Sequence, residues 1–138
     1  MKAPLPENEA HRLKTLQDLE VLDTDHEPEF DELTEMAAKI CNMPVALISL
    51  VDSNRQWFKA KVGLNVDETE REVAFCAHSI LRPSEIMEVP NALLDPRFVD
   101  NTLVTDGPMF RFYAGVPLIA PNGDALGTLC VLDYKPGK

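Results

Sequence analysis

Cys76 and His78 stand two residues apart in an apolar run, and their side chains are the ones in this sequence best suited to chemistry. A thiol beside an imidazole can act as a nucleophile with its base, and the same groups can bind a metal ion. A cysteine can also anchor a chromophore, and either residue can simply pack in the core. The element that carries the pair decides among these four interpretations.

The residues around the pair predict a helix over residues 70–82. Thr69 and Glu72 have the spacing of a capping box, which marks the start of a helix. Residues two apart on a helix point to nearly opposite sides, so Cys76 and His78 should not act together. We therefore predict a buried Cys76, a hydrogen-bonded His78 beneath a loop, and neither a catalytic dyad nor a metal site. In a strand the two would share a face, and the dyad would be restored.

The face of this predicted helix opposite Cys76 suits ligand binding. Phe75, His78 and Arg82 combine an aromatic ring, a group that changes charge near neutral pH, and a cation. An acidic or carbonyl-bearing metabolite would be the natural ligand for such a face. The alternative is that His78 and Arg82 point into solvent. Trp57 is open to two interpretations as well, as a pocket wall or as a ring packed under lysine side chains.

Periodicity predicts the elements that position these residues. A leucine every third residue from 13 to 22 indicates a helix over about residues 7–22. A second helix should begin around Pro28 and end before Pro44. Its buried face is predicted to carry Phe30, Leu33, Ala37 and Ile40.

The rest of the chain favours strands. Residues 45–51 form a run that is apolar apart from Ser49, as in a buried strand, and residues 55–62 alternate, as in a partner with one face partly exposed to water. Residues 86–89 form a weaker strand. Asn122-Gly123 between the apolar runs 110–119 and 125–132 predicts a hairpin of two central strands. Helices followed by an antiparallel sheet covered on both faces indicate an α+β domain.

Composition limits the class of protein. The 138 residues, 45% of them hydrophobic, fit one globular domain, and a net charge of −10 argues against nucleic-acid binding. No apolar run approaches the roughly 20 residues that span a bilayer. The N-terminus lacks a secretory signal, so we expect a cytoplasmic protein. Three widely spaced cysteines indicate reduced thiols.

Several motifs taken together resemble the GAF domain family. They occupy residues 71–72, 75–80, 89–92, 95–101, 111–118 and 127–133, preceded by a leader at residues 12–24. The resemblance is to the modules at the N-termini of bacterial sensor histidine kinases and diguanylate cyclases, and it covers nearly the whole chain.

The resemblance implies a GAF-like six-stranded antiparallel sheet, with terminal helices on one face and a pocket-forming layer, roughly residues 65–109, on the other. Within that layer, Arg97 should form a structural ion pair with Asp95 or Asp100, and Phe98 should pin a tight turn to the sheet. Residues 1–138 then form a single sensory domain, with the helix over 7–22 as a leader or dimerisation element. We expect this domain to be the sensor end of a longer protein.

The function implied is that of a non-enzymatic sensory or regulatory module of bacterial signal transduction. It would bind an unidentified small molecule, or relay a signal as a homodimer through its terminal helices. The resemblance and the residue types give six candidate ligand contacts: Trp57, Phe75, His78, Arg82, Phe112 and Tyr113.

Other chemistries of the family are less well matched. The Asn-Lys-x-Phe-Asp-Glu pattern of members that bind cyclic nucleotides is missing, and residues 97–109 hold no cysteine for a linear tetrapyrrole. We expect no cofactor, no metal and a colourless protein. The enzymatic alternative is a thiol-dependent reductase of free methionine sulfoxide, which would need two of Cys41, Cys76 and Cys130 within disulfide reach.

Overall fold

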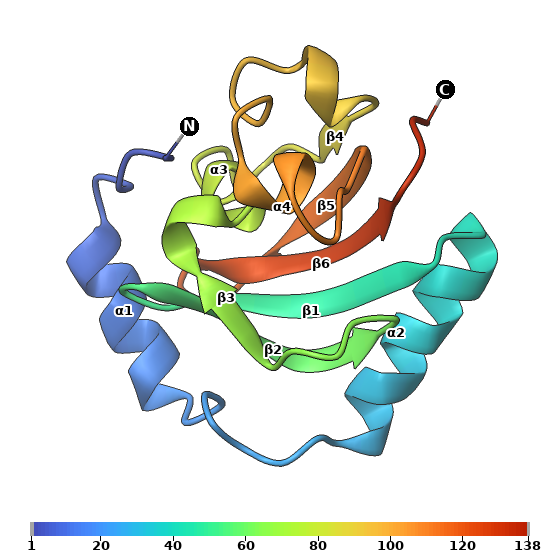
Figure 1. Cartoon of the computed structure of the whole chain (residues 1–138). Helices are drawn as coiled ribbons and strands as arrows, with labels where there is room; N and C mark the ends of the chain where they lie inside the picture. The colour runs from blue at the N-terminus through green and yellow to red at the C-terminus, as the bar shows by residue number, and fades with distance from the viewer. Residues whose placement is uncertain (1, 138) are drawn as a thin grey trace.

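The computed structural model describes residues 2–137 as a sheet with a layer on each face (Figure 1). All six strands are antiparallel, in the order β3-β2-β1-β6-β5-β4. They are β1 (Val45–Val51), β2 (Arg55–Val62), β3 (Glu68–Glu70), β4 (Met87–Val89), β5 (Phe112–Ile119) and β6 (Ala125–Asp133). The predicted α+β fold with its six-stranded antiparallel sheet is confirmed.

Two helices cover one face of the sheet, which we call the helix side. They are α1 (Glu9–Asp18) and α2 (Pro28–Cys41). Leu16 of α1 packs against Trp57 and Leu126, while Ala38 of α2 packs against Phe112 and Val131. In Figure 1, α1 and α2 stand apart toward opposite ends of the strands.

The segments between β3 and β5 cover the other face, which we call the pocket side. They contain two 3-10 turns, η1 (Arg71–Val73) and η2 (Ala92–Leu94), and two short helices, α3 (Cys76–Ser79) and α4 (Thr102–Thr105). The largest core cluster lies here, where Phe75, Phe98 and Val104 pack on strand residues such as Leu47 and Tyr113.

The prediction of a helix over residues 70–82 was wrong. Thr69 does not cap a helix: it lies in β3 opposite Gln56, and its hydroxyl accepts a hydrogen bond from the Gln56 side chain. The chain then makes the turn η1, and regular helix covers only Cys76–Ser79. The strand pairing with β2 replaced the capping interaction that the local sequence suggested.

Two predicted faces also need correction. On α2 the buried residues are Thr34 and Ala38, while Leu33 and Ile40 are 42% and 76% exposed. In α1, which ends at Asp18, only Leu16 of the leucine stripe is fully buried, and Leu19 is 48% exposed.

The predicted alternation along β2 fails at a register shift. The pairing with β1 skips one residue between Phe58 and Ala60, so Phe58 faces the pocket side while Val62 faces the helix side. The skipped residue, Lys59, is buried on the helix side, where its ammonium group donates to the Asp25 carbonyl. The face expected to be partly wet is therefore covered.

Candidate functional site

Two hollows on the pocket side contain predicted ligand contacts. The first, which we call the apolar pocket, has a volume of about 420 Å³. It is lined by Leu47, Gln56, Phe58, Gly63, Leu64, Asn65, Val66, Thr69, Phe75, Cys76, Leu103, Gly107, Pro108, Phe110, Tyr113, Cys130, Leu132 and Tyr134. The second, which we call the surface pocket, has a volume of about 570 Å³ and is lined by Pro4, His78, Ser79, Leu81, Arg82, Glu85, Ile86, Met87, Glu88 and Arg97.

The sheet forms the floor of the apolar pocket, and the covering segments form its walls. Leu47, Cys130 and Tyr113 come from the neighbouring strands β1, β6 and β5. Phe75 precedes α3, and Leu103 belongs to α4. The lining is predominantly apolar, and among residues 2–137 none of its members is acidic or basic. Known small-molecule sites are also mostly apolar cavities with a few polar groups.

Gln56 is the most buried polar side chain in the apolar lining. The Oε1 atom of Gln56 accepts hydrogen bonds from Ser49 Oγ and from Cys76 Sγ, both at 2.9 Å. On its other side, Gln56 Nε2 donates to Thr69 Oγ1 at 2.5 Å. The amide is 6% exposed, and these bonds hold it in one orientation at the edge of the pocket.

Two cysteines line the same apolar pocket, although they are 54 positions apart in the sequence. Burial raises the pKa of the Cys76 thiol to about 11, against the smaller opposing effect of the Ser49 hydrogen bond. Burial also raises the pKa of Cys130 to about 12, helped by the nearby Cys76. At neutral pH both are therefore thiols rather than thiolates, and the thiolate is the nucleophilic form. Cys41 is exposed at the end of α2.

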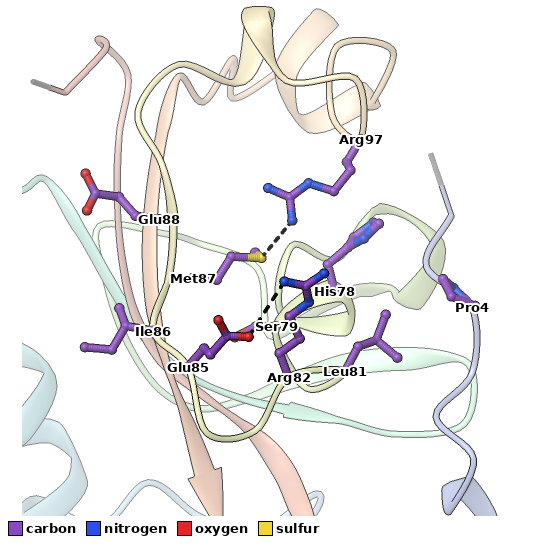
Figure 2. Close-up of a pocket in the computed structure, with 10 residues that line it drawn as sticks. All are labelled: Pro4, His78, Ser79, Leu81, Arg82, Glu85, Ile86, Met87, Glu88 and Arg97. Atoms are coloured by element: carbon purple, nitrogen blue, oxygen red, sulfur yellow. Dashed lines mark hydrogen bonds and ion pairs between the residues drawn. The ribbon is translucent and has the colours of Figure 1, made fainter.

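The surface pocket carries charges of both signs (Figure 2). Arg97 makes a two-armed ion pair with Asp95, with Nη2–Oδ2 at 2.7 Å and Nε–Oδ1 at 3.0 Å. The predicted structural tie of Arg97 to Asp95 is thereby confirmed. Arg82 is 79% exposed and lies 3.7 Å from Glu85. Because both guanidinium groups already face a carboxylate, this pocket offers a weaker anion site than its arginines suggest.

Phe98 contacts one lining residue of each pocket. It is fully buried, and its ring stacks on Phe75 with centroids 4.2 Å apart. The His78 ring meets the same Phe98 edge-on at 4.9 Å. The expected role of Phe98 in fixing the covering layer to the sheet is confirmed, and its ring contacts both an apolar-pocket residue and a surface-pocket residue.

The structure does not bring the six candidate ligand contacts together. Phe75 and Tyr113 line the apolar pocket, whereas His78 and Arg82 line the surface pocket. Trp57 and Phe112 lie on the helix side, beneath α1 and α2. Phe75 and Arg82 do not share a helix face as predicted, because the regular helix covers only Cys76–Ser79. Cys76 is buried, as predicted.

Sequence reasoning missed Gln56 and Thr69, the polar part of the apolar pocket. The alternation of residues 55–62 predicts a strand but no role for Gln56, and the capping-box spacing of Thr69 predicts a helix start instead of a pocket residue. The sequence does show a polar residue, Gln56, within a strand. That it lines a pocket together with Thr69 follows only from the pairing of β2 with β3.

Arg71 and α1 meet in a buried charge cluster beside this pocket. Arg12 is 1% exposed and donates to the Val51 carbonyl at 2.7 Å and to Glu9 Oε1 at 3.0 Å. Burial would raise the pKa of Glu9, but hydrogen bonds from Arg71 and Arg12 outweigh it, and the pKa lies below the usual range. The carboxylate therefore stays charged between two arginines.

No group of three or more metal-ligating side chains occurs among residues 2–137. Within the same residues, no helix has the length and apolar character needed to cross a membrane.

Comparison with known proteins agrees with this architecture. A sequence model of the GAF domain matches residues 25–138, and the chain therefore belongs to the GAF domain family. It is 43% identical over 133 residues to the cyclic di-GMP phosphodiesterase PA2567 of Pseudomonas aeruginosa, covering 96% of this chain but only 22% of that protein. The chain thus spans less than a quarter of this relative's length.

Solved structures share the fold at low identity. The GAF domain of an Acinetobacter phosphoenolpyruvate-protein phosphotransferase superposes with a TM-score of 0.63 at 22% identity, over 93% of this chain and 80% of that one. A type II free methionine-R-sulfoxide reductase from Thermoplasma acidophilum gives 0.61 at 13% identity, over 79% and 74%. At these identities the likeness shows the fold alone.

Proposed function

We propose that this GAF domain is a non-enzymatic, cytoplasmic sensory module that binds a small molecule in the apolar pocket. The observation that carries the proposal is a pocket of about 420 Å³ on the pocket side, with an apolar lining and one oriented amide. Apolar walls with a few placed polar groups are typical of small-molecule sites. The proposed ligand site thus lies away from His78 and Arg82.

The relationship to a cyclic di-GMP phosphodiesterase supports a role in signalling. That relative is far longer than this chain, and we propose that this domain regulates an enzymatic domain elsewhere in its own protein. A bound ligand would act by favouring one of two conformations. The ion pair between Arg71 and Glu9 could transmit a conformational change from the segments that cover the pocket side to α1.

The alternative of a free methionine sulfoxide reductase has one observation in its favour, since Cys76 and Cys130 line one pocket. Two observations oppose it. Both thiols have raised pKa values, and the lining offers no charged group to a free amino acid, which carries both an ammonium and a carboxylate. We expect no turnover of methionine sulfoxide with a dithiol reductant.

Native mass spectrometry of the freshly purified protein tests the binding proposal. The expected result is a bound small molecule that is retained in a His78→Ala, Arg82→Ala double variant. It should be lost in Leu103→Trp, because that larger side chain would fill the apolar pocket. A ligand lost only in the double variant would place the site in the surface pocket and contradict the proposal.

We also propose that two copies of the domain associate through the helix side. Met36 and Ile40 of α2 are 56% and 76% exposed, and Val116 on the adjoining part of the sheet is 44% exposed. Apolar side chains gathered in this way are typical of interfaces. Sedimentation should show a dimer that Ile40→Glu dissociates; a monomer at high concentration would contradict this proposal.

A further inference from the structure

We propose that the ligand of the apolar pocket is an uncharged, largely apolar molecule with a hydrogen-bond acceptor, such as a carbonyl or hydroxyl oxygen, at one end. This inference rests on the proposed function and names the chemical class that the site would take. Three observations support it: the lining has no charged side chain, it is rich in aromatic rings, and Gln56 and Thr69 have hydrogen-bond donors that are not used.

The lining gives a charged ligand nothing to pair with. Among residues 2–137, the side chains that line the pocket are apolar residues, aromatic residues, thiols, two amides and one threonine. Lys61, which donates to the carbonyl of the lining residue Val66 at 3.1 Å, is already paired with Asp67 at 2.8 Å. Moving a carboxylate or phosphate from water into such a site would remove its hydration without replacing it.

The ionisable groups of the pocket do not change this conclusion. Tyr113 is 1% exposed, and burial raises the pKa of its hydroxyl well above the usual value, as it does for the two thiols. The Tyr113 hydroxyl donates to Thr128 Oγ1 at 3.3 Å instead of facing a counter-ion. The pocket is therefore neutral throughout the physiological pH range.

Aromatic rings supply much of the wall. Phe58, Phe75, Phe110, Tyr113 and Tyr134 line the pocket, and the Phe75 and Tyr113 rings lie 5.2 Å apart at a tilt of 34°. Rings placed around a cavity favour flat apolar groups, because such groups can stack on ring faces or meet ring edges. An aromatic or aliphatic body is thus the best match for most of the volume.

The polar end of the pocket is a donor site. Gln56 Nε2 carries two hydrogens, and one of them is given to Thr69 Oγ1. The second has no acceptor among the described residues, and the Thr69 hydroxyl retains its own proton after accepting from Gln56. Gln56 Oε1 is already occupied by two donors, Ser49 and Cys76. At this end of the pocket, Gln56 and Thr69 can therefore donate hydrogen bonds to an acceptor on the ligand.

A set of four probes of matched size tests the inference. Acetophenone is uncharged with an acceptor, ethylbenzene is uncharged without one, benzoate is an anion, and benzylamine is a cation at neutral pH. Each is titrated into the isotopically labelled protein, and binding is followed from the amide signals of Thr69, Phe75 and Tyr113. Acetophenone should saturate these shifts, with benzoate and benzylamine about a hundredfold weaker because of their desolvation.

Two variants test the donor site. In Thr69→Val, which keeps a β-branched residue in β3, acetophenone should bind about fivefold more weakly while ethylbenzene is unaffected. Gln56→Leu should act in the same direction and more strongly. Leu94→Ala, at a side chain 81% exposed and outside the pocket lining, serves as the control and should change neither probe.

The outcomes separate this inference from the function on which it rests. Benzoate binding as tightly as acetophenone, with the same shifted signals, would overturn the inference and leave a small-molecule pocket in place. Equal weakening of acetophenone and ethylbenzene by Thr69→Val would refute the acceptor end alone. If none of the four probes shifts the pocket signals, while the parent spectrum shows a folded protein, the proposed function itself fails.

Discussion

Arg71 and Glu9 form a two-armed ion pair between the pocket side of the sheet and α1, with Nη1–Oε2 at 2.5 Å and Nη2–Oε1 at 3.1 Å. Arg71 directly follows β3, whose Thr69 lines the apolar pocket. Glu9 opens α1, which lies before the residues 25–138 matched by the family model. The pair therefore joins the layer that covers the pocket side to a helix outside the matched region.

Replacing Glu9 by glutamine should destabilise the domain by about 3 kcal/mol, because it leaves the buried Arg12 and Arg71 without their shared counter-charge. Urea unfolding measures this change. Lys14→Gln, which breaks the exposed pair with Asp18 on the same helix, is the matched control and should cost less than about 0.5 kcal/mol. Equal losses of stability in the two variants would show that the buried cluster stabilises the domain no more than an exposed ion pair does.

Acid should release α1 from the domain. Asp124 accepts hydrogen bonds from Thr15 and His11 of α1 and from the preceding Asn8, and these lower its pKa, the Thr15 bond most, against the opposing effect of burial. A carboxyl with a lowered pKa stabilises the fold above its unfolded pKa, about 4, and loses that effect as the pH falls through the folded value. The lowered pKa of Glu9 acts with the same sign.

Trp57 fluorescence measures this release, since the single tryptophan packs against Leu16 of α1. The signal should be constant above about pH 5 and change progressively below about pH 4. Asp124→Asn should weaken α1 docking at neutral pH and flatten the transition, while Asp18→Asn, at an exposed side chain, should leave it unchanged. A transition of the same size in Asp124→Asn would assign the acid sensitivity to another group.

The sheet could be predicted from the sequence because its signals are strong and local. The continuous apolar run of β1 and the Asn122-Gly123 turn between β5 and β6 each specify their element without outside information. The segment 69–82 could not be predicted in the same way. Thr69 satisfies the rule for a helix cap, yet its pairing partner Gln56 lies 13 residues earlier, and that contact forms only in the folded sheet.

The candidate site was predicted in part for the same reason. Cys76 and Tyr113 could be recognised as buried or as pocket-lining from their types and motifs. Phe75 and His78 line different pockets, and both rings contact Phe98, which comes 20 residues after His78, so their arrangement depends on a contact distant in the sequence. Trp57 and Phe112 lie on the helix side because each alternates with a pocket-side neighbour in its strand, Phe58 and Tyr113, and the sequence alone does not say which face of a strand carries the pocket.

Thiol reactivity should distinguish the three cysteines. Cys41 is exposed and should react with a thiol reagent within minutes, whereas Cys76 and Cys130 should react only on unfolding, even at pH 9, because their pKa values are about 11 and about 12. Cys76→Ala should cost about 1 kcal/mol of stability, through the lost volume and the lost bond to Gln56. Labelling of Cys76 at the rate of Cys41 would contradict its burial.

The central claim, that the apolar pocket binds a small molecule, is tested most directly by a thermal-shift screen of uncharged metabolites on three proteins in parallel. Compounds that raise the melting temperature of the parent should raise that of the His78→Ala, Arg82→Ala double variant equally. They should have no effect on Leu103→Trp, whose pocket is filled. Stabilisation of Leu103→Trp to the same extent as the parent would place the ligand elsewhere and contradict the claim.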